Sequence, residues 1–278
     1  MSHLPDNLPH HEIIKAKRST SQWLIMVHGL TQNKNLFNKQ IPEFKDDLNL
    51  LLIDLPGHGG SSKIKGPYGL SEYAHAIHQV IAHHNITNSI FWGTHIGAGS
   101  GLLLACQKPN LFSSLILEGP VFPGRNFPLV SKLLGKIAKA IATKGLTAAK
   151  EIWWQDGPWF SIMQENPIEC RAADQLKLIE EFKGQPWLPE QKSTVGIASI
   201  EPQIAKLTYP ILIINGEHDV PEFIEIAREL YDLLPNAQQK SIEQAGGFPL
   251  WEYPKEVNSV VQKFIQSMLE KNGSALSN

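Results

Sequence analysis

The chain has 278 residues, of which 42% are hydrophobic and 19% charged, values typical of a globular protein with a full apolar core. A formal net charge of −2 provides no basic field to hold nucleic acid or an anionic membrane surface. Two cysteines are too few for a disulfide framework, and the first residues lack the basic and apolar runs of a signal peptide. We therefore expect a cytoplasmic protein that binds neither nucleic acid nor membranes.

Short apolar runs alternate with helical patterns, as in a mostly parallel sheet with crossover helices. The expected strands are an edge strand near Glu12–Lys17 and buried strands at Trp23–Val27, Leu48–Leu55, Ser89–Thr94, Ser114–Glu118, Tyr209–Asn215 and Gln239–Glu243. The expected helices are Leu36–Lys45, Ser71–His84, Gly97–Gln107, Glu222–Leu234 and Pro254–Lys271, with Ser71 as the N-cap of the second helix.

The alternation breaks between Pro120 and about Glu201. This stretch contains the helical run LVSKLLGKIAKAIATKG, then WWQDGPWF, then a second helical run at Glu165–Phe182. An insertion of this size between two strands predicts a helical cap at 120–202, placed on a core made of 1–119 and 203–278.

Six local motifs follow one another in a fixed order: MVHGLTQ, IDLPGHGGSS, WGTHIGAGSG, LEGP, ILIINGEHD and AGGFPLWEYP. Their order and spacing resemble the α/β-hydrolase fold superfamily over about residues 20–268. The resemblance implies an α/β fold, with a mostly parallel twisted sheet, helices on both faces and a helical cap insertion.

In that family the turn that follows the strand corresponding to Ser89–Thr94 is the nucleophile elbow, G-x-S-x-G. Here it reads Gly93-Thr94-His95-Ile96-Gly97, so both glycines remain while an imidazole replaces the hydroxyl. The resemblance assigns the acid to Asp219 and places Gly247 where the histidine base would stand. Since His218 is the last histidine of the chain, we predict that ordinary Ser-His-Asp hydrolysis is lost.

Two roles remain open for His95. In the first, its ring fills the space of the missing histidine, hydrogen-bonds directly to Asp219 and titrates higher than an isolated histidine. Such a dyad would act as a general base beside an oxyanion hole, which the resemblance assigns to the N–H groups of Leu30 and Ile96. In the second, His95 only fills space in a site without activity, hydrogen-bonded to Asp219. Glu118 is a further carboxylate, read either as facing the site or as contacting the surface or the cap.

A ligand pocket is expected under the cap, lined by Trp153, Trp154, Trp159, Gly247 and Phe248, although the tryptophans equally suit packing between helices. His75 and His78 have ligand-like spacing, but no carboxylate or cysteine completes a metal set, so we expect no metal and no cofactor. The partner is expected to be a small-molecule ligand or substrate. Two functions follow: a non-catalytic binding or regulatory protein, or an enzyme with altered chemistry based on His95 and Asp219.

Overall fold

The computed structural model describes residues 7–193 and 200–275. Within these residues a seven-stranded sheet runs in the order β1-β3-β2-β4-β5-β6-β7. All neighbouring strands pair in parallel except β1, which is antiparallel to β3. The strands are β1 (His11–Ile14), β2 (Trp23–Val27), β3 (Asn49–Ile53), β4 (Ser89–Thr94), β5 (Phe112–Glu118), β6 (Ile211–Gly216) and β7 (Ala237–Ile242).

The predicted strands and fold class are confirmed. The strands β2, β3, β4 and β6 are buried along nearly their whole length, because crossover helices cover both faces of a parallel sheet. Strand β7 is different: it closes one edge of the sheet, and its four central residues are all exposed. Its run AQQKSI is polar for that reason, and the apolar pattern predicted its start two residues too late.

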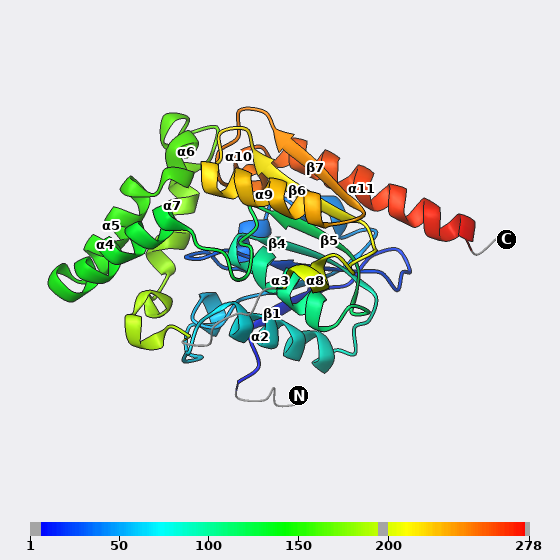
Figure 1. Ribbon diagram of the computed structural model, residues 1–278, viewed down its shortest axis with the longest axis horizontal. Coiled ribbons are helices and arrows are strands. Elements are labelled where there is room, and N and C mark those ends of the chain that lie inside the picture. The colour runs from blue at the N-terminus through cyan, green and yellow to red at the C-terminus, as the bar shows by residue number, and fades with distance from the viewer. Residues whose placement is uncertain (1–6, 194–199, 276–278) are drawn as a thin grey trace.

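Helices α2 (Leu70–His83), α3 (Ile96–Gln107) and α9 (Pro221–Leu233) lie in front of the sheet in Figure 1, while α11 (Pro254–Ala275) passes behind it. Hydrogen bonds connect the segment before the short helix α1 (Ile41–Phe44) with α11 and with the short helix α10 (Pro249–Glu252). There, Asn258 donates to the Lys39 carbonyl at 3.0 Å, and Gln40 donates to the Leu250 carbonyl at 3.0 Å.

Two details of the predicted core helices are wrong. The run Leu36–Lys45 is not one helix but a 3-10 turn at Lys34–Phe37 followed by α1, in which Pro42 stands in the first turn, where no N–H is needed. Ser71 is not an N-cap, because α2 begins at Leu70 with Gly69 as its cap residue. The preceding backbone is already fixed by a hydrogen bond from the Tyr68 N–H to the Gln191 carbonyl.

The insertion between β5 and β6 is helical and lies at one end of the sheet (Figure 1). It contains α4 (Pro128–Lys144), α5 (Leu146–Asp156), α6 (Ser161–Glu165) and α7 (Ala172–Glu181), and α8 (Glu201–Ile204) precedes β6. The predicted helix Glu165–Phe182 is interrupted, because Asn166 ends α6 and Arg171 takes a positive φ of 52° before α7. Helix α5 was missed.

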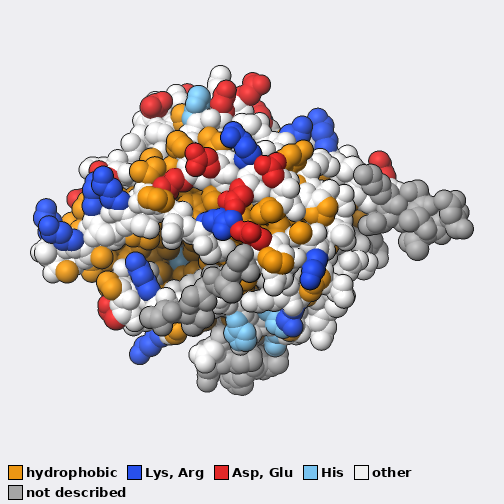
Figure 2. Space-filling view, viewed as in Figure 1, with side chains coloured by type: hydrophobic (Ala, Val, Ile, Leu, Met, Phe, Trp, Pro, Cys, Tyr) orange, Lys and Arg blue, Asp and Glu red, His pale blue; other side chains and the backbone are white. Residues whose placement is uncertain are grey.

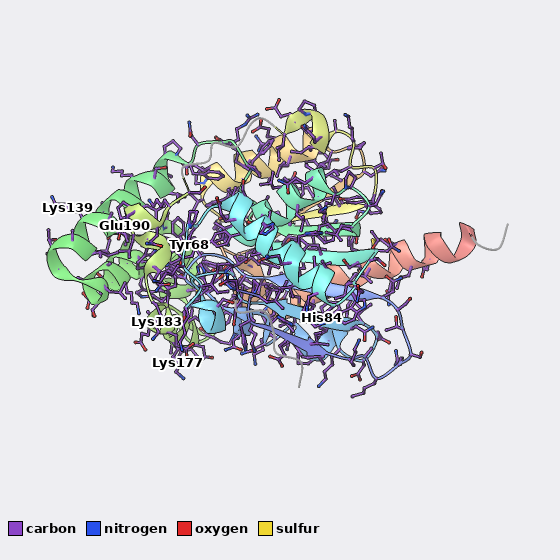
Figure 3. All side chains as sticks on the ribbon, turned by 90° about the horizontal axis from the view of Figure 1, so that it is seen from below. Tyr68, His84, Lys139, Lys177, Lys183 and Glu190 are labelled. Atoms are coloured by element: carbon purple, nitrogen blue, oxygen red, sulfur yellow. The ribbon has the colours of Figure 1, made fainter. Side chains whose placement is uncertain are left out.

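The outer surface of the insertion is charged and its inner surface is aromatic. Lys139, Lys177 and Lys183 project outward from it in Figure 3, and Tyr68 of the core lies at its border. The Tyr68 hydroxyl donates to the Gln185 side chain at 3.1 Å, which ties the end of the insertion to the core. No helix in the described ranges is both long and apolar enough to cross a lipid bilayer.

Candidate functional site

The turn between β4 and α3 has the geometry of a nucleophile elbow. His95 has φ 47° and ψ −113°, a strained conformation for a residue with a side chain. The turn is tight because a Cβ on Gly93 would lie 2.6 Å from the Ala98 nitrogen. A Cβ on Gly97 would lie 2.5 Å from the carbonyl oxygens of Val27 and His28. Strand and helix therefore touch through backbone alone, and the turn aims the side chain at position 95 outward from the sheet.

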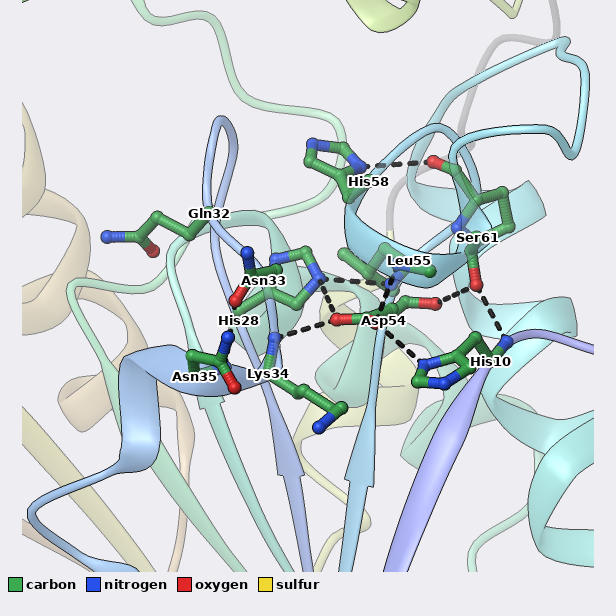
Figure 4. A network of polar contacts seen from close by, with 12 residues as sticks. His10, His28, Gln32, Asn33, Lys34, Asn35, Asp54, Leu55, His58 and Ser61 are labelled. Atoms are coloured by element: carbon green, nitrogen blue, oxygen red, sulfur yellow. Dashed lines mark hydrogen bonds and ion pairs between the residues drawn. The ribbon is translucent and has the colours of Figure 1, made fainter. Parts of the chain in front are cut away.

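The loop after β2 is held in place by buried polar contacts around Asp54 (Figure 4). One Asp54 oxygen accepts from the Lys34 N–H at 2.7 Å, and the other accepts from the Gly60 N–H and lies 2.9 Å from the His10 ring. These bonds join the loop after β2 to the loop after β3 and to the segment before β1.

His28 fixes the same loop from beneath. Its Nε2 accepts from the Leu55 N–H at 3.0 Å, so its Nδ1 carries the proton and donates to the Gly29 carbonyl at 2.7 Å. Burial lowers the pKa of His28, with Asp54 opposing the shift, and the neutral tautomer is retained. These bonds fix the backbone next to Leu30, and the role of its N–H in an oxyanion hole stays a prediction.

The N–H groups of Leu30 and Ile96 are both unused, since neither donates to any atom of the described residues. Both residues line the same cavity as His95. Ile96 is the first residue of α3, where N–H groups have no partner within the helix. The structure thus brings the three predicted residues together at the floor of one cavity.

The His95 ring lies in a tight apolar slot and is only 8% exposed. Its centroid is 4.7 Å from that of Phe248 and 5.3 Å from that of Phe223. A Cβ on Gly119 would lie 3.1 Å from Nε2, closer than side chains usually pack, whereas one on Gly29 would make ordinary contact with Nδ1 at 3.4 Å. Neither ring nitrogen makes a hydrogen bond of good distance and angle to the described residues, and the Gly247 backbone interacts with the ring without meeting that geometry.

The predicted hydrogen bond between His95 and Asp219 is wrong. The Asp219 carboxylate accepts instead from the Asn215 amide at 2.9 Å and from the Val220 N–H at 2.8 Å, both in its own loop. The expected rise in the pKa of His95 is also wrong. Burial lowers it to about 4, with the nearby Gly247 backbone opposing the shift. The ring is therefore neutral near pH 7.

The place of the missing histidine base is occupied by the insertion. A Cβ on Gly247 would lie 2.4 Å from the Cβ of Trp159, so no side chain fits at that position. A second tryptophan, Trp153, donates from Nε1 to the Thr31 hydroxyl at 3.0 Å and secures the insertion to the loop after β2. The space that was expected to open beside the elbow is closed at Gly247 by Trp159.

The cavity above the elbow has a volume of about 280 Å³ and lies between the insertion and the core. Figure 2 shows it as a hollow with hydrophobic side chains around it. Of the predicted pocket residues, Trp153, Trp159 and Phe248 line it. Trp154 instead packs against Phe160, with ring centroids 4.9 Å apart, and Gly247 lies beneath Trp159.

The sequence reasoning missed Phe127, Phe223 and Arg125, which also line the cavity. Phe223 lies in the first turn of α9, four residues after Asp219. This closeness in sequence to the acid could have placed Phe223 near the site. The Arg125 guanidinium lies over the Phe122 ring. It also donates hydrogen bonds to the carboxylates of Glu201 and Glu229, and its Nε lies 2.9 Å from a Glu229 oxygen.

Three buried carboxyl groups lie on the other side of the elbow. Glu118 accepts from the Leu250 N–H at 3.1 Å and Glu252 from the Gly246 N–H at 2.5 Å, and each retains one oxygen without a partner. Burial raises the pKa of Glu118 and of Glu252 to about 8 and that of Asp219 to about 7, so protonated forms persist near neutral pH.

Glu118 is thus fully buried rather than at the surface, and it does not line the cavity. Glu252 was missed because nothing in the motif AGGFPLWEYP marks it as buried. Across residues 7–193 and 200–275, no group of three or more His, Cys, Asp or Glu side chains is arranged to hold a metal ion.

Comparison with known proteins identifies relatives along most of the chain. A family model described as "alpha/beta hydrolase fold" matches residues 22–254. An uncharacterized hydrolase of Bacillus subtilis is 24% identical over 265 residues, covering 88% of this chain and 90% of the relative. A 2-succinyl-6-hydroxy-2,4-cyclohexadiene-1-carboxylate synthase from an Enterobacter species is 25% identical over 251 residues, covering 88% and 92%.

Solved structures show the same fold. MenH from S. aureus superimposes with a TM-score of 0.79 at 22% identity, covering 94% of this chain and 99% of that one. An enol-lactonase from Burkholderia xenovorans gives a TM-score of 0.79 at 18% identity, covering 92% and 96%. At these identities the structural likeness establishes the fold alone.

Proposed function

The chain belongs to the α/β-hydrolase fold family, and within that family we propose that it binds a small, largely apolar molecule without hydrolysing it. The observation that carries the proposal is His95, a neutral imidazole without a partner on the floor of an apolar cavity, where a nucleophile would stand. Residues 120–202 act as the cap over a core of 1–119 and 203–278. The small net charge supports a role without nucleic-acid or membrane partners, and the low cysteine content supports a cytoplasmic one.

Serine catalysis has no residues to support it at this elbow. A serine hydroxyl needs an adjacent base to become a useful nucleophile. The nearby Ser100 lies in α3, where its hydroxyl donates to the Ile96 carbonyl at 2.6 Å. The place of the base is filled by Trp159, which packs on Gly247.

An enzyme based on His95 is the competing function. The free amides of Leu30 and Ile96 beside the ring favour it, because they are suited to a developing oxyanion. Against it, a general base works best with a pKa near the working pH, whereas that of His95 is about 4. The Asp219 carboxylate, which would raise it, is bonded elsewhere.

A combined labelling and turnover experiment tests this function. The protein is incubated with a fluorophosphonate and analysed by intact mass, and separately with p-nitrophenyl esters of short acids. We expect no adduct and no turnover above the rate of ester hydrolysis in buffer without protein, and the Trp154→Phe variant, changed off the cavity, should behave in the same way. A stoichiometric serine adduct contradicts the proposal. Ester turnover that His95→Phe abolishes establishes the competing enzyme instead.

A further inference from the structure

We propose that His11 and His84 bind one divalent transition-metal ion, of the class of Zn²⁺ and Ni²⁺, between their Nε2 atoms. The two residues are 73 positions apart in the sequence and meet where the edge strand β1 lies beside the end of α2. His84 directly follows α2, at the end of this helix that lies farther from the insertion in Figure 3. Neither histidine lines the cavity above the elbow, so the inference does not depend on the proposed function.

The two imidazole rings face each other through their nitrogen atoms. The Nε2 atoms are 2.7 Å apart, and the ring centroids are 4.8 Å apart with the ring planes inclined at 73°. A contact this short between two nitrogens has room for one hydrogen, so at least one of them presents a lone pair to the other. The imidazole nitrogen is a preferred ligand of zinc, copper and nickel ions.

The hydrogen bond of His11 to the backbone identifies that lone pair. Its Nδ1 lies 2.7 Å from the Pro9 carbonyl oxygen, and because a carbonyl only accepts, this nitrogen carries the hydrogen. In the neutral ring, Nε2 is then unprotonated, and it lies against His84. Metal-binding histidines have this same arrangement, in which one ring N–H donates to a backbone carbonyl and so fixes the direction of the other nitrogen.

An ion fits between the rings after a small movement. Metal–nitrogen bonds of about 2.0–2.1 Å at tetrahedral or octahedral angles place two ligand nitrogens about 3.0–3.4 Å apart, so the present 2.7 Å must widen slightly. His84 can make this change, because it is only partly buried and its side chain makes no other hydrogen bond to the described residues. The hydrogen of His84 moves from Nε2 to Nδ1, so binding changes its tautomer without a net loss of a proton.

Water completes the coordination of this ion. Over residues 7–193 and 200–275, no further His, Cys, Asp or Glu side chain makes the pair into a group of three that could hold a metal. Two imidazoles and several waters form an open site, which loses its ion to a chelator. Magnesium and calcium ions prefer oxygen ligands, so a site of two nitrogens discriminates against them.

The fold creates this pair, and the sequence gives no sign of it. The expectation that no metal is bound considered His75 and His78, which are close in sequence on one helix. A bound ion would add a link to β1, a strand of four residues that pairs only with β3. In the unfolded chain His11 and His84 are far apart, so the ion should bind the folded protein more tightly and stabilise it.

Metal titrations of paired variants test the inference. Protein without an affinity tag is stripped with a chelator and titrated by calorimetry with Zn²⁺, Ni²⁺ and Mg²⁺ near pH 7.5, where an ordinary histidine is mostly neutral. We expect one equivalent of Zn²⁺ or Ni²⁺ to bind and Mg²⁺ to give no binding heat. His11→Gln and His84→Gln should each weaken binding at least tenfold. The double variant should weaken it no further, because both residues hold the same ion.

A matched control and a stability measurement complete the test. The double variant His75→Gln with His78→Gln removes two histidines from the same helix and should keep the full affinity. Zn²⁺ should raise the urea midpoint of the wild type and of this control, and it should leave that of His11→Gln with His84→Gln unchanged.

Each contrary result overturns the inference. Binding that survives both single substitutions, or that is lost in the His75 and His78 control, places the ion elsewhere. Losses that add in the double variant indicate two separate sites. If neither Zn²⁺ nor Ni²⁺ binds saturably, the contact between His11 and His84 is a hydrogen bond only. None of these results changes the proposed binding in the cavity, which the labelling and turnover experiment tests separately.

Discussion

The two sides of the site differ in what holds them together. The elbow side, formed by the β4–α3 turn and the loop after β2, depends on backbone contacts at Gly93 and Gly97 and on the bonds of Asp54. The acid side, formed by the loops after β5, β6 and β7, depends on side chains. There, Glu118 and Glu252 each keep an oxygen without a partner.

This difference explains which part of the family architecture is kept here. A turn made by backbone atoms and glycines places whatever residue stands at position 95, so its geometry does not depend on a serine. A triad depends on side chains from separate loops that must meet, and here Asp219 bonds within its own loop while Trp159 closes the space at Gly247. The following substitutions test the contrast.

Gly97→Ala on the elbow side should have the largest effect. Its Cβ would lie 2.5 Å from the Val27 and His28 carbonyl oxygens, and backbone atoms cannot swing aside as a flexible side chain can. We expect the free energy of unfolding to fall by about 3 kcal/mol or more, measured by urea denaturation. The control is Gly135→Ala in the exposed part of α4, where the Cβ meets nothing within 4 Å. This change should stabilise by about 0.5–1 kcal/mol. Equal effects of the two would show that strand and helix do not touch.

Asp54→Asn should have the next largest effect. An amide cannot accept on both sides, so at least one of the bonds from the Lys34 and Gly60 N–H groups is lost. Hydrogen bonds to charged groups contribute about 1.5–3 kcal/mol, and we expect a loss of about 2 kcal/mol in urea denaturation. Asp156→Asn, which removes an exposed ion pair with Lys136, should change the stability by less than about 0.5 kcal/mol. A similar loss in both variants would contradict the role given to Asp54.

Gly247→Ala tests whether Trp159 closes the acid side. Since the new Cβ would lie 2.4 Å from the Trp159 Cβ, the insertion must shift, and we expect a loss of about 1–2 kcal/mol. Ligand binding should weaken as well, because Trp159 lines the cavity. A variant with unchanged stability and unchanged tryptophan fluorescence would show that this space is open.

Glu118→Gln should have an effect on stability that depends on pH. Because burial raises the pKa of Glu118 to about 8, the folded protein binds this proton more tightly than the unfolded chain does. The contribution of Glu118 to stability is therefore lost as the pH rises from about 4.5 to 8. At 1.36 kcal/mol per pKa unit, the free energy of unfolding of the variant, relative to wild type, should rise by about 3.5 kcal/mol between pH 5 and 8. The exposed Glu43→Gln serves as the control, and a difference that stays flat for Glu118→Gln would contradict its burial.

Much of the fold could be predicted from the sequence because its signals are local. Apolar runs located the strands of the sheet, and β2 and β4 agree with their predicted bounds. The motif Gly93-Thr94-His95-Ile96-Gly97 predicted the elbow, because a turn this tight needs those glycines. Other features have no distinctive local pattern in the sequence, and helix α5 and the buried Glu252 are examples.

The sequence by itself also determined that no serine stands at the elbow and no histidine follows His218, since both are statements about residue identity. It did not determine what His95 contacts. Whether its ring reaches Asp219 depends on the bonds that Asp219 makes in its own loop and on Trp159, brought by the insertion to Gly247. Such contacts join residues far apart in the chain, and the direction of a side chain across a cavity leaves no periodic trace in the sequence. Only the tertiary structure decided them.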